Sequence, residues 1–500
     1  MNFSNVFKAT LLATFLIKLL LAYVIPMSGD EAYFIIWAKN LDFGYYDHPP
    51  MAGWFLYGMR FLGDSEVILR LPAILLSSLI GIGIYQFLKT RDETKAALIA
   101  ILFLISPLNI INVLITTDTP LILFAFLSAA SLYKALEKDQ LVWYGLSGIF
   151  FGMAFLSKYF AVLLGLAYLT YFLFSTKNWH KSRGFALLYL AALPFALINI
   201  YWNYTHCWDN ILFNLYTRNE GEQFSLGKIA TYFGTQIYLM TPPVVYYLFK
   251  HRANFVRSLN NDNLKLFFFA FFIPMAAFAA LALKKLIGLH WVLAFYPFLY
   301  ILLFHYLSRA ELIKTTKFMA WFSITHLAII TVISVMPMET WIKTKWYDGI
   351  VFMFKTNEIA DHIRPYEKQF LLAADGYTPA AIISYSYGKD FFVFGEGSYH
   401  ARQDDIVTDF RQFSGRNILI VKKSAPDISQ YAPYFQRVEF KQFTLRGATF
   451  FYVLGYNFNY EQYKIKVLTP IKDKYYKIPD YLPHTPCYFC EKYFNEGAKP

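Results

Sequence analysis

Residues 6–27 form an apolar run that indicates the fold class: Val-Phe-Lys-Ala-Thr-Leu-Leu-Ala-Thr-Phe-Leu-Ile-Lys-Leu-Leu-Leu-Ala-Tyr-Val-Ile-Pro-Met. The hydrocarbon core of a bilayer takes about 20 mostly apolar residues per crossing, so this run predicts one membrane span. No small-residue cleavage pattern precedes Ser28, and we therefore expect a retained span rather than a removable signal peptide. Lys18 lies inside the run and must reach the interface or face protein.

Similar runs recur as far as about residue 337 and predict a polytopic α-helical membrane protein with about eleven spans. The other ten are expected near 66–88, 96–116, 120–136, 142–157, 159–175, 184–201, 229–249, 264–283, 289–308 and 318–337. Composition excludes a soluble enzyme, because 57% of the 500 residues are hydrophobic and only 16% are charged.

The formal charge of +12 is spread between apolar segments rather than gathered on one face. This pattern favours membrane lipid over nucleic acid as a partner. Alternate short loops between the apolar runs carry an excess of Lys and Arg over the loops between them, and they are predicted to be cytoplasmic. The opposite loops, with everything after about residue 338, are expected on the outer side.

After residue 338 the apolar runs shorten to strand length, at 369–374, 391–394 and 417–421. We expect a transmembrane domain over 1–337 and an extracytoplasmic α/β domain over 338–500. The three cysteines exclude a disulfide framework and allow at most one short bridge. Cys487 and Cys490 are expected as a local disulfide or as two free thiols, since no second ligand pair supports a zinc site.

The first outer loop, residues 28–65, is too apolar for an ordinary exposed loop. The segments after Asp30 and after Pro50 are predicted to be interfacial helices, which places Asp30 and Glu31 at the membrane boundary as candidate catalytic acids. A structural role is the alternative, because Ser28-x-x-Glu31 matches a helix capping box. Asp47 and His48, in Gly44-Tyr-Tyr-Asp-His-Pro-Pro, are further candidate site residues.

Asp118 and Lys158 lie in two other outer turns. Asp118, in Thr116-Thr-Asp-Thr-Pro, is a candidate catalyst whose alternative role is a helix cap. Lys158, in Leu156-Ser-Lys-Tyr, is a lone lysine in an apolar stretch, which favours a polar partner over snorkelling.

Lys284 and Lys285, followed by His290, also belong to the outer set, with interfacial anchoring as their alternative role. Acids and cations at headgroup depth suit transfer from a lipid-linked phosphate. Cations stabilise a phosphate leaving group, and an acid can deprotonate a hydroxyl or hold a divalent metal. No soluble-nucleotide motif is present, so we expect a membrane-borne donor.

Five motifs, in this order, resemble the bacterial branch of the dolichyl-phosphate-mannose protein mannosyltransferase superfamily, which includes the aminoarabinose transferases that modify lipid A. They are Asp30-Glu-Ala-Tyr, Gly44-Tyr-Tyr-Asp-His-Pro-Pro, Arg70-Leu-Pro, Thr117-Asp-Thr-Pro-Leu and Leu156-Ser-Lys-Tyr. The resemblance covers roughly residues 10–310. It implies an inverting glycosyltransferase of the GT-C type that takes a sugar from a polyprenyl-phosphate donor in the bacterial inner membrane, with its active site facing the periplasm.

By this resemblance, Asp30 corresponds to the essential first-loop acid and Asp118 to a second acid associated with catalysis or a divalent metal. Lys158 corresponds to a cation beside the donor phosphate, and Lys284 and Lys285 match less closely. A lipid A-type glycolipid is the favoured acceptor, and a protein or a cell-wall polymer is the alternative. A transporter or flippase of lipid-linked intermediates is the main rival, although no internal repeat supports it. An assembly scaffold would leave Asp30, Asp118 and Lys158 without a shared purpose.

Overall fold

The computed structural model describes residues 2–176 and 178–494, which divide into two compact units. Unit 1 comprises Met1–Ile25, Pro49–Asn199 and Gly221–Ser334. Unit 2 comprises Pro26–His48, Ile200–Glu220 and Val335–Pro500. The expected domain boundary near 337 falls close to the last of these divisions. Two stretches that were predicted to lie in outer loops, 26–48 and 200–220, nevertheless pack with the C-terminal residues.

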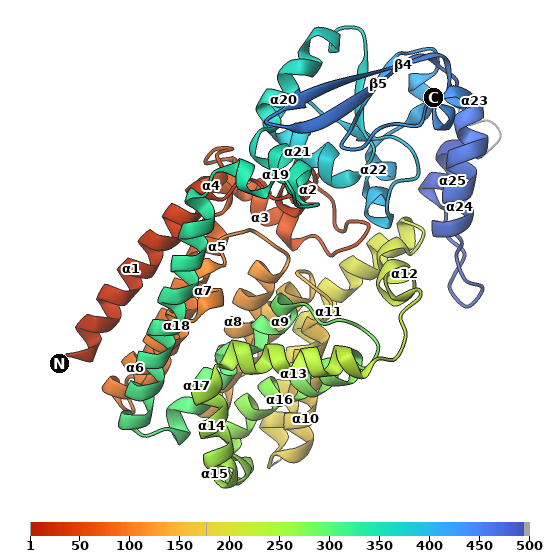
Figure 1. Ribbon diagram of the computed structural model, residues 1–500. Coiled ribbons are helices and arrows are strands. Elements are labelled where there is room, and N and C mark those ends of the chain that lie inside the picture. Colours follow the sequence, from red (N-terminus) through yellow and green to blue (C-terminus); the bar gives the residue numbers. More distant parts are fainter. Residues whose placement is uncertain (1, 177, 495–500) are drawn as a thin grey trace. The chain divides into compact units, whose positions relative to one another are not determined.

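Unit 1 is helical (Figure 1). Its helices are α1 (Phe3–Val24), α3 (Met51–Arg60), α4 (Glu66–Leu69), α5 (Leu71–Leu88), α6 (Glu93–Leu104), α7 (Pro107–Ile111), α8 (Asp118–Lys138), α9 (Leu141–Phe155), α10 (Ala161–Phe174), most of α11 (Trp179–Thr205), α13 (Leu226–Met240), α14 (Pro242–Lys250), α15 (Arg252–Arg257), α16 (Asp262–Ala282), η3 (Leu289–Phe295), α17 (Tyr296–Tyr306) and α18 (Arg309–Val335).

Seven helical segments among the described residues are long and apolar enough to cross a membrane: α1, α5, α8, α11, Leu264–Ala282, Leu289–Tyr306 and α18. The helices α9 and α10 are apolar but shorter. All eleven predicted spans fall on helical structure, and the count of eleven crossings stays a prediction. The chain is a polytopic helical membrane protein, as its composition predicted.

Three of the predicted spans are interrupted. The span 66–88 breaks at Arg70, between α4 and α5, and in the other two spans the break lies directly before a proline. Within 96–116, α6 ends before Ser106 and α7 begins at Pro107. Within 229–249, Thr241 has φ +68° and separates α13 from α14, which begins at Pro242. Proline lacks an N–H donor and disfavours helical geometry in the residue before it, so neither helix continues through the break.

Two buried cations hold the N-terminal helix α1 in unit 1. Lys18 Nζ donates to the carbonyl of Ala73 at 2.8 Å and to Ser77 Oγ at 3.0 Å, so this lysine faces protein. Arg70 donates to the carbonyls of Ala22 and Ile25, at 2.7 and 2.6 Å. The last carbonyls of a helix have no intrahelical donor, and Arg70 satisfies those of α1.

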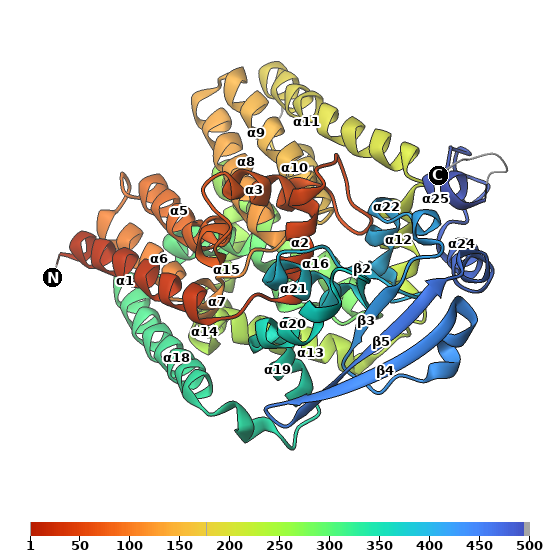
Figure 2. The same cartoon turned by 90° about the horizontal axis from the view of Figure 1, so that it is seen from above.

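The helices α8, α9 and α10 pack closely in unit 1 (Figure 2), and α9 also contacts α11. A Cβ at Gly148 of α9 would lie 2.1 Å from the carbonyl oxygen of Leu188 in α11. Only glycine permits this approach, which is a common device for helix packing in membranes. Ser128 and Ser147 link α8 to α9 through reciprocal bonds to each other's backbone carbonyls, both 2.9 Å.

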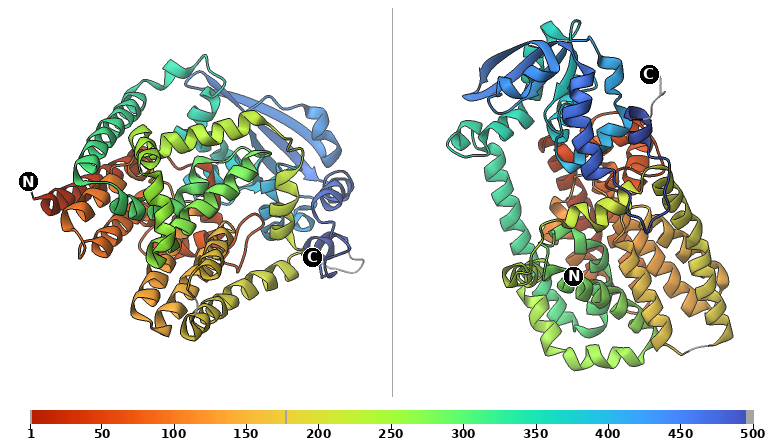
Figure 3. Two further views of the ribbon diagram at one scale, coloured as in Figure 1. Left: turned by 90° about the horizontal axis from the view of Figure 1, so that it is seen from below. Right: turned by 90° about the vertical axis from the view of Figure 1, so that its right-hand side faces the viewer.

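Unit 2 contains a five-stranded sheet of order β2-β1-β3-β5-β4, which confirms the α/β expectation for the C-terminal region (Figure 3). The strands are β1 (Leu371–Ala374), β2 (Phe392–Val393), β3 (Ile418–Lys422), β4 (Phe435–Leu445) and β5 (Ala448–Phe458). The first three pair in parallel, and β5 pairs antiparallel with β3 and β4. A Cα register of Leu371 with Ile418 fixes β1 against β3.

The helices of unit 2 are α2 (Gly29–Lys39), α12 (Asp209–Leu215), α19 (Tyr347–Phe354), α20 (Thr356–Ile363), α21 (Tyr377–Tyr387), α22 (Arg402–Val407), α23 (Tyr460–Tyr463), α24 (Thr469–Tyr475) and α25 (Tyr488–Tyr493). Helix α2 packs against α21, and its residues are buried from Glu31 to Ala38 except for Ile36. This burial explains why α2 is apolar on nearly every side. The placement of α2 and α3 at a membrane surface stays a prediction.

A disulfide joins Cys207 to Cys487, 280 residues further along the chain, and Cys490 is a free thiol. The expectation of a short local bridge or two free thiols at Cys487 and Cys490 is therefore wrong. The reason is that residues 200–220 fold into unit 2, which brings Cys207 to the Cα–Cα distance of 4.8 Å from Cys487.

We expect Cys207→Ser to destabilise unit 2 by about 2–4 kcal/mol, because the cross-link constrains the unfolded chain. Thermal unfolding in detergent measures the effect, and Cys490→Ser is the matched control that should change nothing. Alkylation of the unreduced protein followed by mass spectrometry should modify one cysteine, Cys490. Three modified cysteines would contradict the pairing.

A buried acidic cluster in unit 2 makes stability depend on pH. Burial, with the neighbouring charge of Asp405, raises the pKa of Asp404 to about 7. Burial also raises the pKa of Asp405 and that of Asp209, with Arg402 opposing both shifts. A carboxyl group whose pKa is higher in the folded than in the unfolded chain loses stability as pH rises between the two values.

The thermal midpoint should therefore fall as pH rises from about 4 to about 7. Above pH 7 the contribution of Asp404 to this fall should end. The lowered pKa of Asp47 works in the opposite direction only below pH 4. Asp404→Asn should flatten this dependence, while Asp480→Asn, at an exposed position, should leave it unchanged. A midpoint that rises from pH 5 to pH 7 in the wild type would contradict the assignment.

Candidate functional site

The predicted site residues of unit 1 centre on an ion pair between Asp118 and Lys158. Lys158 Nζ donates to both carboxylate oxygens of Asp118, at 2.9 and 2.8 Å, and the two side chains are 6% and 4% exposed. Asp118 opens α8, and Lys158 follows the end of α9. The Asp118 carboxylate therefore binds Lys158 instead of acting only as a helix cap.

His290 lies close to one set of charged side chains in unit 1, and the neighbouring lysines Lys284 and Lys285 lie close to another. His290 Nε2 is 3.8 Å from Asp118 Oδ2, and its side chain is 56% exposed. Lys284 offers its backbone carbonyl to Lys228 Nζ at 2.6 Å. The hydrogen bond from Lys228 lowers the pKa of Glu222, and the positive charge of Lys285 adds to that lowering. The structure thus brings His290 to the Asp118–Lys158 pair, and it groups Lys284 and Lys285 with Lys228 and Glu222.

The two predicted acids of the first turn of α2, in unit 2, have different surroundings and different roles. Glu31 is buried and forms the capping box: its Oε2 accepts from Ser28 N at 3.2 Å, and Ser28 Oγ accepts from Glu31 N at 3.3 Å. Asp30 lies outside the box and is exposed, and its Oδ1 accepts from Tyr377 Oη at 3.4 Å. The capping alternative therefore applies to Glu31, and Asp30 keeps a carboxylate at the surface of the unit.

Asp47 and His48 lie in the loop after α2, and Asp47 is buried. Its Oδ2 contacts His400 Nδ1 at 2.8 Å, and its Oδ1 accepts from Tyr33 Oη at 3.4 Å. Burial alone would raise the pKa of Asp47, but His48 and His400 hold it below the usual value. Sequence reasoning missed His400, because it lies 353 residues from its partner in a segment without a recognisable motif.

A divalent metal at Asp30 and Asp118 finds little support in the side chains present. Lys158 neutralises Asp118, and an ammonium group at this distance repels a cation. Among the described residues, no group of three or more His, Cys, Asp or Glu side chains could hold a metal ion. The metal stays a prediction, and no step below depends on it.

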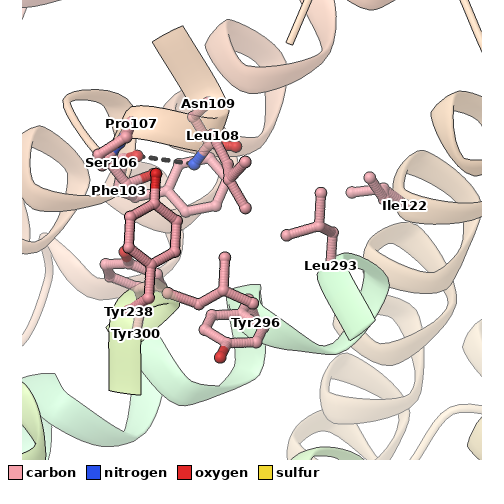
Figure 4. Close-up of a pocket in the computed structure, with 11 residues that line it drawn as sticks. Phe103, Ser106, Pro107, Leu108, Asn109, Ile122, Tyr238, Leu293, Tyr296 and Tyr300 are labelled. Atoms are coloured by element: carbon pink, nitrogen blue, oxygen red, sulfur yellow. Dashed lines mark hydrogen bonds between the residues drawn. The ribbon is translucent and has the colours of Figure 1, made fainter. Parts of the chain in front are cut away.

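A narrow, mostly apolar pocket opens in unit 1 at the break between α6 and α7 (Figure 4). It is lined by Phe103, Ser106, Pro107, Leu108, Asn109, Ile122, Tyr238, Leu239, Leu293, Tyr296 and Tyr300. Asn109 Nδ2 donates to the carbonyl of Phe103 at 2.7 Å and satisfies a group that the helix break exposes. Apolar walls with a few hydroxyl groups suit part of an acyl or isoprenoid chain.

Comparison with known proteins agrees with the motif resemblance. Residues 47–202 match the family model described as dolichyl-phosphate-mannose-protein mannosyltransferase. The chain is 23% identical over 245 residues to the lipid A galacturonosyltransferase RgtD of Rhizobium johnstonii, which covers 47% of this chain and 51% of that protein. The match thus spans about half the length of this curated relative.

Two solved structures share the fold. They are ArnT from Cupriavidus metallidurans in the apo state and the same protein bound to undecaprenyl phosphate. Each has a TM-score of 0.60 and covers 90% of this chain and 97% of ArnT, at 15% and 14% sequence identity respectively. The chain has the GT-C-type fold of ArnT, a helical membrane domain with a small C-terminal sheet. The family match over residues 47–202 agrees with the resemblance to the mannosyltransferase superfamily in that part of the chain.

Proposed function

We propose that the protein is an inverting glycosyltransferase that moves a sugar from a polyprenyl-phosphate donor to a lipid A-type glycolipid. The observation that carries this proposal is the Asp118–Lys158 pair, in which an apolar helical unit keeps two charged side chains at positions that match the superfamily motifs. Buried charges are costly and usually mark function in membrane proteins. The match to RgtD supports lipid A as the acceptor, and the ArnT complex supports a polyprenyl phosphate as the carrier.

Within this reaction, Asp118 fixes the ammonium group of Lys158, and Lys158 stabilises negative charge on the donor phosphate as the bond to the sugar breaks. Asp30 provides the exposed carboxylate at the start of α2.

The direct test uses purified protein in lipid nanodiscs with lipid A and a polyprenyl phosphate that carries galacturonic acid. A second reaction uses the aminoarabinose donor. Mass spectrometry should show lipid A with one added sugar. In cells, lipid A from the wild type should carry a sugar mass that is missing from the deletion strain. If the deletion strain instead lacks a sugar on a protein or a cell-wall polymer, the assignment of lipid A as the acceptor is wrong, but the glycosyltransferase assignment still holds. No transfer to any acceptor would contradict the function.

We also infer that unit 2 lies on the periplasmic side of the inner membrane. Disulfides persist in oxidising compartments and are rare in the cytosol, which supports a periplasmic position for Cys207 and Cys487. A cysteine introduced at exposed Glu220 into a variant that keeps only the native pair should react with a membrane-impermeant maleimide in intact spheroplasts. A thiol placed at exposed Lys89 should react only after permeabilisation, and the reverse pattern would invert the orientation.

A further inference from the structure

Asp47 and His400 form a carboxylate–imidazole pair inside unit 2. Asp47 Oδ2 lies 2.8 Å from His400 Nδ1, and the Asp47 side chain is only 3% exposed. A buried carboxylate at this distance favours the tautomer in which Nδ1 carries the proton and donates it. The lone pair of the imidazole is then on Nε2. The pair has the relation that orients a histidine base in hydrolases.

The surroundings fix His400 in place. Tyr33 of α2 donates through its hydroxyl to the backbone carbonyl of His400 at 3.2 Å, and the ring of Tyr377 lies 5.0 Å from the imidazole. Tyr46 N donates to Gln403 Oε1 at 2.7 Å, which joins the Asp47 loop to α22. His400 is therefore held at its backbone by Tyr33 of α2, and at its ring by Asp47 and by Tyr377 of α21.

The second imidazole nitrogen is available. Within the described residues Nε2 of His400 makes no hydrogen bond, while the side chain is 28% exposed. A small cavity lined by Tyr33, Tyr377, His400, Gln403 and Asp404 adjoins the ring. Tyr377, which contacts His400, also donates to Asp30, so the predicted essential acid and the histidine share one neighbour.

We propose that His400 is the proton acceptor of the transfer reaction, that Asp47 is its positioning residue, and that the acceptor nucleophile is a sugar hydroxyl rather than a phosphate. A phosphate is already ionised near pH 7 and needs no base, whereas a hydroxyl does. This inference rests on the proposed glycosyltransferase function.

The acceptor hydroxyl oxygen forms a bond to the anomeric carbon of the donor sugar, and its proton moves to His400 Nε2. The bond from that carbon to the phosphate oxygen breaks, and its electron pair leaves with the polyprenyl phosphate. Asp47 stays ionised and stabilises the imidazolium that forms. Asp30 takes no proton here and acts through its negative charge.

Kinetics at several pH values test the proposal in nanodiscs with lipid A and the polyprenyl-phosphate galacturonic acid donor. Histidine bases titrate between pH 5 and 8, and carboxylate bases titrate lower. The charged or titratable groups that face His400 are Asp47, Tyr33, Tyr377 and Tyr399, with Asp404 on the same cavity. Wild-type kcat should fall as pH drops from 7 to 5. His400→Gln should lower kcat by about 10²- to 10⁴-fold, leave the donor KM unchanged and remove that pH dependence.

Further variants separate chemistry from folding. Asp47→Asn should also lower kcat, and combining it with His400→Gln should add little, because the two residues act as a unit. Added imidazole should restore part of the activity of His400→Gly. His362→Gln, at an exposed histidine of the same unit, is the matched control and should behave as wild type.

The outcomes distinguish this inference from the proposed function. A wild type that transfers no sugar to any acceptor overturns both. A wild type that transfers sugar to a phosphate, a kcat that is flat between pH 8 and 5, or a His400→Gln variant with unchanged kcat overturns only the histidine assignment. If His400→Gln fails to fold, the wild-type pH profile and the Asp47→Asn variant still give the answer.

Discussion

Asp30→Asn should lower the kcat of sugar transfer by at least about 10³-fold, while the protein folds as before. The carboxylate lies outside the Ser28–Glu31 capping box, so the substitution leaves the box intact. It removes one acid from the first turn of α2, which costs about 0.3–1 kcal/mol through the helix dipole. Its catalytic cost is larger, because positive charge develops at the anomeric carbon in the transition state and the variant offers no negative charge to stabilise it.

The measurement compares kcat in nanodiscs with the thermal midpoint of the same preparation. Asp390→Asn is the matched control, since Asp390 pairs with Lys39 at the other end of α2 and its side chain is 90% exposed. Asp390→Asn should have the kcat and the thermal midpoint of the wild type. Near-normal turnover by Asp30→Asn would assign Asp30 to local structure alone.

Lys158→Ala should harm both stability and donor use. The substitution leaves the Asp118 carboxylate buried without its ammonium partner, and breaking a buried pair typically costs about 3–5 kcal/mol. Loss of a charge-assisted contact to the donor phosphate should cost a further 1.5–3 kcal/mol or so, hence on the order of ten- to hundredfold in kcat/KM for the donor.

A double variant separates the two effects. Asp118→Asn with Lys158→Gln replaces the ion pair by neutral groups that can still hydrogen-bond, so it should recover much of the thermal midpoint. Donor use should stay impaired, because no cation remains at this position. A double variant that regains wild-type donor kinetics would show that Lys158 is only structural.

The sequence was sufficient to predict the membrane fold class, the apolar helical segments before residue 338 and the strands β1, β2 and β3, but it did not predict the two long strands β4 and β5. Apolar runs of about 20 residues and the change to strand-length runs are local signals, and local periodicity survives folding. The capping box at Ser28 and Glu31 is equally local and appears in the structure as the pattern predicted.

Long-range pairings were not predictable in the same way. The contacts of Asp47 with His400 and of Cys207 with Cys487 join residues 353 and 280 positions apart. No sequence spacing specifies such pairs, because the packing of three separate stretches in unit 2 creates them. The pairing of Asp118 with Lys158 lies between these cases: each charge was conspicuous in its apolar setting, but their mutual contact required the packed helices.

The disulfide also constrains the order of events during biosynthesis. Cys207 leaves the ribosome 280 residues before Cys487, roughly 15–60 s earlier at ordinary elongation rates of about 5–20 residues per second. During that interval it is an unpaired thiol, in a stretch whose packing partners have not yet been made. The helices of unit 1 that precede residue 335 can assemble while the chain grows, but the disulfide of unit 2 can form only after Cys487 has been made. The covalent closure of unit 2 therefore comes later than the assembly of these helices, and it requires an oxidant at that time.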